Sequence, residues 1–320
     1  MDALTDLFSS LQQGLFEAVV QPLSFALGQG NLLDTAYEGT GWLVVGLLQI
    51  LVMVVVIGPL QKRWPVEPMV DAHTVKVDIL YTAIHRLGLF KLVMFFTLET
   101  WFENAWGSLR AWGLPTWHLD QIWPGVTDQA AVSFVLYLVV FDFVHYLIHR
   151  AQHQSELWWR LHALHHAQRQ MTMWSDNRNH LLDDALTSVL LAMVAMLVGV
   201  GPGQFVAVVA VSQLSENFQH ANVRLWFGRV GERLWVSPRF HRRHHSIGIG
   251  HESEVQGRTV LGGCNFGVLL PWWDMLLGTA DFQLRYDPTG VRDQVEQGRD
   301  YGRGFWAQQW RGLLRLVGRA

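Results

Sequence analysis

The stretch RLHALHHAQRQ, residues 160–170, holds three histidines within five positions: His162, His165 and His166. The stretch RFHRRHHS, residues 239–246, repeats this HxxHH spacing with His241, His244 and His245. Residues at i, i+3 and i+4 share one face of a helix, so each box presents three imidazoles on one side. Imidazole is a neutral metal ligand at physiological pH, and the repeated box predicts a metal site.

Further histidines extend this pattern on either side of the first box. His149 and His153 in HRAQH are one helical turn apart, and His145 lies one turn before them. His220 closes QLSENFQH, one turn after Glu216. Eight box histidines and His220 exceed the four ligands of a tetrahedral zinc ion. We therefore predict two metal ions that share nine histidines and leave a coordination position open for water or a diatomic molecule.

The composition points to a membrane protein. Half of the 320 residues are hydrophobic, 16% are charged, and the chain has 16 tryptophans. Tryptophan is enriched where proteins meet the two membrane–water interfaces. The formal net charge of −3 argues against nucleic acid as a partner. Cys264 is the single cysteine, which excludes an internal disulfide and a thiolate cluster.

Four apolar stretches predict membrane spans: 41–60, about 80–101, 130–149 and 185–214. Gly-Pro-Gly at 201–203 breaks the last stretch into a hairpin of two short helices. In the second stretch, Arg86 and Lys91 must either snorkel or face protein. The predicted fold is an all-α integral membrane protein of about four transmembrane helices, capped by a cytosolic helical domain that carries the histidine boxes. A large soluble helical core is the alternative.

The distribution of lysine and arginine predicts the orientation. Residues 1–41 contain neither, whereas the segments 61–79, 150–184 and 215–320 contain most of them. The positive-inside rule places the N-terminus outside and the histidine boxes on the cytoplasmic face, most simply of a bacterial inner membrane. The broken hairpin returns the chain to the cytoplasmic side, so that both HxxHH boxes lie on the same face.

Three parts follow from these features: residues 1–140 hold an N-terminal amphipathic segment and the first spans, 141–280 hold the histidine boxes and the hairpin, and 281–320 form a C-terminal tail. In the tail, one helical face carries Trp306, Trp310, Leu313 and Val317 and another carries arginines. This helix either lies on the anionic cytoplasmic leaflet or packs on the cytoplasmic domain.

Zinc is the competing metal, and it predicts another class of protein. A zinc hydrolase needs a carboxylate to act as base on bound water, and HExxH is absent. A metal transporter carries ligands within its spans, whereas these histidines cluster at span ends and in cytoplasmic segments. A zinc-binding membrane protein without redox chemistry, either a hydrolase or a metal transporter, stays as the alternative to an oxygenase.

The ordered motifs resemble those of the fatty acid hydroxylase/sterol desaturase superfamily of membrane di-iron proteins. They are DFVHYLIHRAQH (142–153), WWRLHALHH (158–166), NFQHANVRL (217–225), SPRFHRRHHS (237–246) and CNFGVLLPWWDMLLGT (264–279). The resemblance implies two iron ions as cofactor, with O2 as co-substrate. It also implies nine iron ligands: His149, His153, His162, His165, His166, His220, His241, His244 and His245.

Four residues near the motifs are candidates for further roles. Glu216 stands where some members have a histidine, and it is a ligand, a partner of a ligand, or a helix residue without a catalytic role. His145 stands where an aromatic residue is common and either packs or donates to a ligand. His180 lies where sterol-type members carry a histidine. Asp142 either accepts the outer N–H of a ligand imidazole or satisfies the polar end of its own span.

The resemblance implies an O2-dependent lipid hydroxylase or desaturase, an oxidoreductase that acts on an unactivated C–H bond. The reductant is expected to be external, a ferredoxin, a small cytochrome or a reductase, because no flavin or dinucleotide fingerprint is present. The partners expected are thus the membrane, a lipid substrate drawn from the bilayer, and this electron donor. Apolar spans discriminate weakly by composition, so the substrate stays open among sterols, fatty acids and other lipids.

Overall fold

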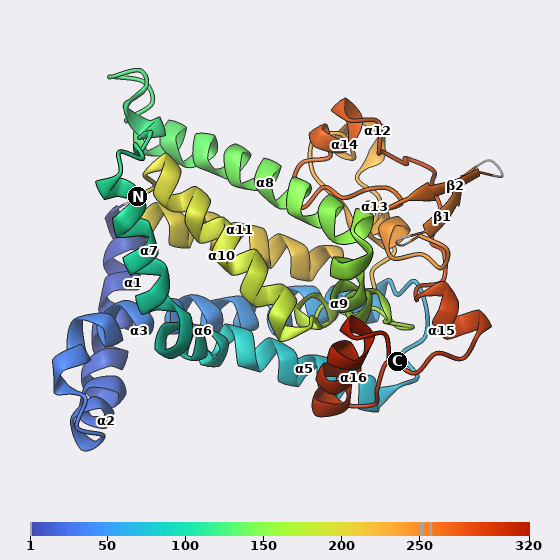
Figure 1. Cartoon of the computed structure of the whole chain (residues 1–320), viewed down its shortest axis with the longest axis horizontal. Coiled ribbons are helices and arrows are strands. Elements are labelled where there is room, and N and C mark those ends of the chain that lie inside the picture. Colours follow the sequence, from blue (N-terminus) through green and yellow to red (C-terminus); the bar gives the residue numbers. More distant parts are fainter. Residues whose placement is uncertain (1, 250–251, 256–257) are drawn as a thin grey trace.

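The computed structural model describes residues 2–249, 252–255 and 258–320. Its long helices run along the longest axis of the molecule, and short helices and loops gather at one end (Figure 1). The predicted helical class is right for the body of the molecule. The prediction missed one antiparallel hairpin of two strands, β1 (Glu252–Val255) and β2 (Arg258–Leu261).

The α-helices of the first third are α1 (Asp2–Leu15), α2 (Gln21–Ala26), α3 (Leu33–Val52), α4 (Gly58–Arg63), α5 (Ala72–Arg86), α6 (Leu89–Met94) and α7 (Thr100–Ala111). Those of the remainder are α8 (Ala130–Gln154), α9 (Glu156–His166), α10 (Leu181–Val198), α11 (Pro202–Gln219), α12 (Gly228–Gly231), α13 (Pro238–His244), α14 (Trp272–Leu276), α15 (Arg292–Glu296) and α16 (Phe305–Leu316). Five-residue π-helical segments join α1 to α2, α3 to α4 and α6 to α7.

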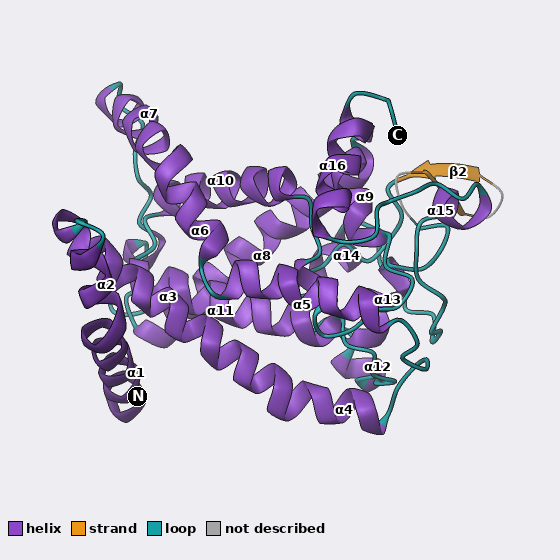
Figure 2. Cartoon of the chain, turned by 90° about the horizontal axis from the view of Figure 1, so that it is seen from below, coloured by secondary structure: helices purple, strands orange, loops and turns teal. Residues whose placement is uncertain are grey.

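Three helical stretches of the described chain are long and apolar enough to cross a membrane: Gly30–Arg63, Ala130–Gln154 and Leu181–Val198. They contain the predicted spans 41–60 and 130–149 and the first arm of the predicted hairpin. Seen from two directions, α1, α2 and α7 lie at one end of these helices, and α9 and α13 lie at the other (Figures 1 and 2).

The predicted span at 80–101 is not one straight helix. It is divided between Ala72–Arg86 and Leu89–Ala111, which meet at an angle of 53° and count as a fourth span only if taken together. The bend follows from Gly88, whose φ of +81° is a left-handed conformation that ends α5. Of the two alternatives, Arg86 is buried and faces protein, whereas Lys91 is exposed and lies over a single aromatic ring. Arg86 Nη2 donates to Asn217 Oδ1 at 2.8 Å, and Lys91 Nζ lies 2.8 Å from the centre of the Trp42 ring.

The Gly-Pro-Gly break produces the predicted hairpin. α10 ends at Gly199, which has a φ of +67°. α11 begins at Pro202, and proline fits this first position because the N–H that it lacks would have no partner within the helix. Both helices pack against α8. Since α11 runs back toward the end where α9 lies, His220 arrives beside the first HxxHH box.

The C-terminal helix α16 is attached to the body of the molecule. The Gln309 side chain donates to Tyr81 Oη and to the backbone oxygen of Asn179, both at 3.0 Å. Arg315 donates to the backbone oxygen of Arg160 at 3.0 Å. The helix therefore packs on the domain, which is one of the two predicted arrangements. Its apolar stripe nevertheless faces outward, and Trp306 in that stripe is 81% exposed.

A close helix crossing provides a test of this arrangement. A Cβ atom on Gly46 of α3 would lie 1.8 Å from the backbone oxygen of Arg86, whereas Gly39 on the same helix has nothing within 4 Å. Gly46→Ala should lower the free energy of unfolding by about 1–3 kcal/mol, since it overpacks the crossing. Thermal unfolding of the detergent-purified protein measures this, with Gly39→Ala as the matched control. Equal stability of the Gly46→Ala variant and the parent would contradict the crossing.

Candidate metal centre

Four helices deliver the nine box histidines to one place. His149 and His153 lie on the last turns of α8, and His162, His165 and His166 lie on α9. The short link between these helices is sharp because Ser155 ends one and caps the other, its hydroxyl accepting from the backbone N–H of Trp158. The end of α11 supplies His220, and α13 supplies the three histidines of the second HxxHH box.

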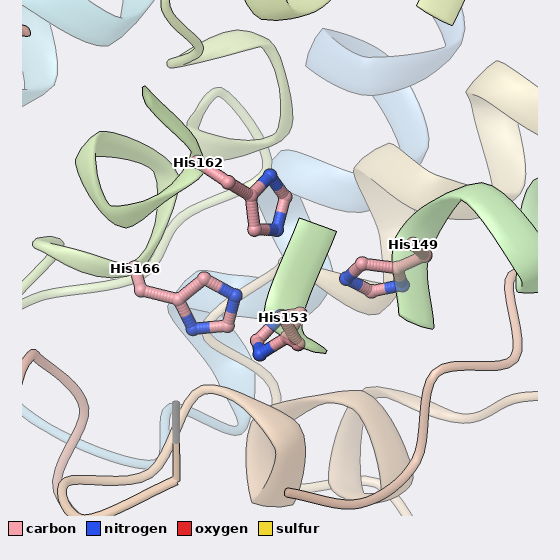
Figure 3. Close-up of side chains that lie close together, drawn as sticks. All are labelled: His149, His153, His162 and His166. Carbon is pink, nitrogen blue, oxygen red and sulfur yellow. The ribbon is translucent and has the colours of Figure 1, made fainter. Parts of the chain in front are cut away.

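The histidines form two adjacent groups, each able to hold one metal ion. The first group is His149, His153, His162 and His166, whose rings surround a common space in Figure 3. The second group is His165, His220, His241 and His245. His244 forms a further cluster with His166 of the first group and His245 of the second. The rings of His166 and His245 stack with centres 4.3 Å apart, so the two groups touch.

The nitrogen spacing in the second group fits ligands of a single ion. His220 Nε2 lies 3.1 Å from His165 Nε2 and 3.0 Å from His241 Nε2. His241 Nε2 lies 3.1 Å from His245 Nε2. Two nitrogens bound about 2.1 Å from one metal are about 3.0 Å apart at a right angle and about 3.4 Å apart at the tetrahedral angle. These distances are compatible with ligands of a single ion.

Burial favours the neutral form of several of these imidazoles. All nine are buried. Burial lowers the pKa of His244 to about 3. Burial and neighbouring imidazoles together hold the pKa well below its usual value for His165, His166, His241 and His245. Several ring nitrogens, including His162 Nε2 and His244 Nε2, have no hydrogen-bond partner among the described residues. A buried unpaired polar atom costs about 1–3 kcal/mol, and a metal ion removes that cost.

Groups behind the rings fix which nitrogen faces the centre. His162 Nδ1 lies 3.0 Å from Asp183 Oδ2, so its N–H donates outward and Nε2 points inward. The other oxygen of Asp183 accepts from Gln152 Nε2 and Trp158 Nε1, both at 2.7 Å. His220 Nδ1 lies 2.8 Å from the backbone oxygen of Glu216, with Asp176 Oδ1 at 3.5 Å.

Two backbone carbonyls orient the rings of His149 and His244 in the same way. The Nδ1 atom of His149 lies 2.9 Å from the oxygen of Phe266, and that of His244 lies 2.8 Å from the oxygen of Cys264. Both carbonyls belong to the segment that follows the β hairpin. The closing CNFG motif thus orients one ligand from α8 and one from α13.

Two of the predicted site residues have a different role. Asp142 does not contact an imidazole: its oxygens accept from the backbone N–H of Leu269 at 2.7 Å and from Trp273 Nε1 at 2.8 Å. The alternative that it satisfies polar groups at the end of its span is the better description. His180 lies in neither metal group, because Nδ1 accepts from the backbone N–H of Leu182 and Nε2 lies 3.0 Å from the oxygen of Gln309. It caps α10 and holds α16.

His145 and Glu216 also lie outside the two groups of the described chain. Each is half-buried and lies one turn before a box histidine, on α8 and α11 respectively, toward the apolar part of the helices. They therefore lie on the span side of the histidine cluster.

The sequence prediction missed Asp176 and Asp183. Neither stands at a ligand spacing from a box histidine, and acidic residues such as Asp183 in the first turn of a helix are usually explained by the helix dipole. Their position in the sequence was the signal that could have identified them. Both lie in the polar stretch between the first HxxHH box and the hairpin, and this stretch had to pass near the histidines.

Residues 134–279 match the family model described as fatty acid hydroxylase, and this range contains the eight histidines of the two groups and His244. Residues 134–279 are thus similar to a fatty acid hydroxylase domain. The resemblance found in the sequence motifs is confirmed.

Several curated proteins are similar to this chain. It is 31% identical over 183 residues to ornithine lipid hydroxylase OlsE of Rhizobium tropici, an alignment that covers 56% of this chain and 51% of that protein. It is 24% identical over 176 residues to fatty acid hydroxylase vlmA of a Lecanicillium species, covering 51% and 45%. It is 24% identical over 156 residues to alkylglycerol monooxygenase of Caenorhabditis elegans, covering 49% and 28%. The chain thus spans about half the length of the first two relatives. No solved structure matches the chain.

The roles assigned to His165 and His180 make opposite predictions. His165→Ala should remove one of two bound metal ions per chain, because it takes a nitrogen from the second group. His180→Ala should keep full metal content and lower the free energy of unfolding by about 1 kcal/mol, as expected for loss of a helix cap. Metal analysis and thermal unfolding of both purified variants measure this. Full metal content in His165→Ala, or metal loss in a folded His180→Ala protein, would reverse the assignments.

Proposed function

We propose that this chain is a membrane di-iron oxygenase that hydroxylates or desaturates a C–H bond of a lipid, with O2 and an external electron donor. One observation carries the proposal: two touching groups of buried imidazoles beside the end of α8, a helix apolar enough to cross a membrane. A donor set of imidazole nitrogens suits iron. The names of the three relatives described above, two hydroxylases and a monooxygenase, support the same reaction class.

Bound iron would supply the oxygen chemistry, and the residues of the chain would hold the ions and exclude water. The nine imidazoles hold the ions, and Asp183, Asp176 and the two carbonyls keep the ring nitrogens aimed inward. Phe266 meets the rings of His149, His153 and His244 edge-on, with centres 5.2–5.9 Å apart. Together with Trp159, whose ring centre is 5.0 Å from that of His153, it forms an apolar wall that excludes water from a reactive site.

The lipid substrate is proposed to approach from the bilayer along α8 and α11. These two helices pack together, and each carries a box histidine at the end where the loops gather. His145 and Glu216 lie one turn before these histidines, so a chain that slides between the helices passes them before it reaches the metals. Their polar side chains would contact the substrate next to the carbon that reacts.

The histidine face is proposed to be cytoplasmic, which gives the electron donor access. The orientation rests on the arginine- and lysine-rich segments that surround the boxes. Single cysteines placed in a Cys264→Ala background test it: one at position 124 should react with an impermeant maleimide in intact cells, and one at position 299 should react only after lysis. The reverse labelling pattern would place the boxes outside.

The exposed face of α16 is proposed to lie at the bilayer border. Trp306 is 81%, Trp310 61% and Val317 65% exposed, and these residues follow one side of the helix. The opposite side is docked through Gln309 and Arg315, so the helix is held with its apolar stripe outward. Lipids brominated near the headgroup should quench Trp306 and Trp310 fluorescence in the full-length protein, and an absence of quenching would exclude membrane contact.

Zinc binding without redox chemistry is the competing function. The two groups of four imidazoles would each satisfy a zinc ion by number. Metal analysis of protein purified without air decides between them. About two irons per chain supports the oxygenase, and zinc in a chain that leaves the lipids unchanged under reducing conditions supports the alternative.

The reaction itself is tested by lipid mass spectrometry. Cells that express the chain should contain a lipid that has gained one oxygen or lost two hydrogens, compared with cells that lack it. The His165→Ala variant should abolish this product, while His73→Ala, a histidine outside the centre, should keep it. An unchanged lipid profile in cells that accumulate iron-loaded protein would contradict the proposed activity.

A further inference from the structure

We propose that a second site, on the far side of α9 from the metals, binds a small ligand through a phosphate group. The site is a cavity of about 530 Å³ in the cap, bordered by the loop before α5, by α9 and by the loop before α16. Its volume is in the range of small-molecule sites. Leu164 and Ala167 of α9 line it, and none of the nine histidines does. The inference is therefore independent of the proposed oxygenase activity.

The cavity has positive charge without a protein partner. Arg169 and Arg303 line it, both are exposed, and neither forms an ion pair or hydrogen bond with a described residue. The acidic lining residues are engaged elsewhere. Glu67 pairs with Arg242 at 3.0 Å, and the Asp71 carboxylate accepts from the backbone N–H and the hydroxyl of Thr74 at 3.0 and 2.7 Å. The charge left for a ligand is positive.

A buried arginine adds a donor with no partner. Arg178 is only 4% exposed, and its Nε donates to Asp78 Oδ1 at 2.5 Å. Its Nη2 has no hydrogen-bond partner in the part of the chain that the structure describes, although Arg178 lines the cavity. A guanidinium held by one carboxylate and left with a free N–H is suited to a phosphate oxygen, which accepts charge-assisted hydrogen bonds.

The first turns of two helices border the same cavity. Asp71, His73 and Thr74 belong to the start of α5, and Gly302, Arg303 and Gly304 precede α16. Gly304 is the N-cap of α16 and provides no side chain to accept from the free N–H groups of its first turn. An anion beside Gly304 would accept from those groups and interact favourably with the dipole of α16, whereas the first turn of α5 is already capped by the Asp71 carboxylate. The arginines and the start of α16 together favour an anionic phosphate group over a neutral ligand.

The cavity is larger than inorganic phosphate, so the ligand carries an organic part. Two sources have the same chemistry, a phospholipid headgroup from the adjacent bilayer and a soluble phosphate ester. The test uses the full-length, metal-loaded protein in a non-ionic detergent. Glycerol 3-phosphate represents the soluble source and a short-chain phosphatidylglycerol the lipid source, each compared with chloride at equal ionic strength. The shift in the thermal unfolding midpoint with concentration gives the apparent Kd.

At least one of the two compounds should raise the unfolding midpoint where chloride does not. The Arg169→Gln/Arg303→Gln double variant should bind it roughly tenfold more weakly or worse, as expected for the loss of charge-assisted hydrogen bonds. Arg229→Gln, an exposed arginine of the same cap outside the cavity, should bind like the parent. Binding of glycerol 3-phosphate identifies a soluble ligand, and binding of phosphatidylglycerol alone identifies a headgroup.

A second measurement avoids dependence on the variants. In the unchanged protein, the compound that binds should protect Arg169 and Arg303 from phenylglyoxal, as measured by peptide mass spectrometry, and should leave Arg229 reactive. The proposal is overturned if neither compound stabilises the protein more than chloride, if the double variant binds as tightly as the parent, or if the two cavity arginines react equally with and without the compound.

Discussion

Nine imidazoles share one buried volume, and they can do so only while they are neutral. Ring nitrogens in the second group are 3.0–3.1 Å apart. Two positive charges about 3 Å apart repel by roughly 5 kcal/mol even at an effective dielectric constant of 20, so protons cannot occupy neighbouring rings. Lone pairs that face one another without protons are also unfavourable, because each is a buried acceptor without a donor. A cation between the rings removes both costs, and the architecture is best understood as a container for such ions.

The rest of the structure holds this container closed. The hairpin of α10 and α11 returns His220 to the first box, and Arg86 anchors the return through Asn217. Asp142 contributes indirectly. It binds the backbone at Leu269, while Asp274 binds the N–H of Phe266, and this fixes the segment whose carbonyls receive His149 and His244. The orientation of His149 and His244 therefore depends on two carboxylates that contact neither ring.

Much of this was predictable from the sequence. Helical spacing predicted which histidines share a face, and the Gly-Pro-Gly break predicted the hairpin that brings the boxes together. These predictions were possible because the spacing of the histidines and the length of an apolar stretch can be read from a short segment of sequence. The bend at Gly88 was missed because a glycine in an apolar helix is often tolerated, and only packing shows that it ends α5. The roles of Asp142, Asp183 and His180 depend on contacts between residues up to 131 positions apart, which no local pattern encodes.

The most direct test of the account is an anomalous difference map, recorded at the iron absorption edge from crystals of protein purified and loaded with iron without air. The account predicts two peaks in each chain. One lies about 2.1 Å from ring nitrogens of the first group, and the other lies at the same distance from ring nitrogens of His165, His220 and His241. A single peak, or peaks that lie outside both groups while the histidines keep the described arrangement, would contradict the two-metal centre.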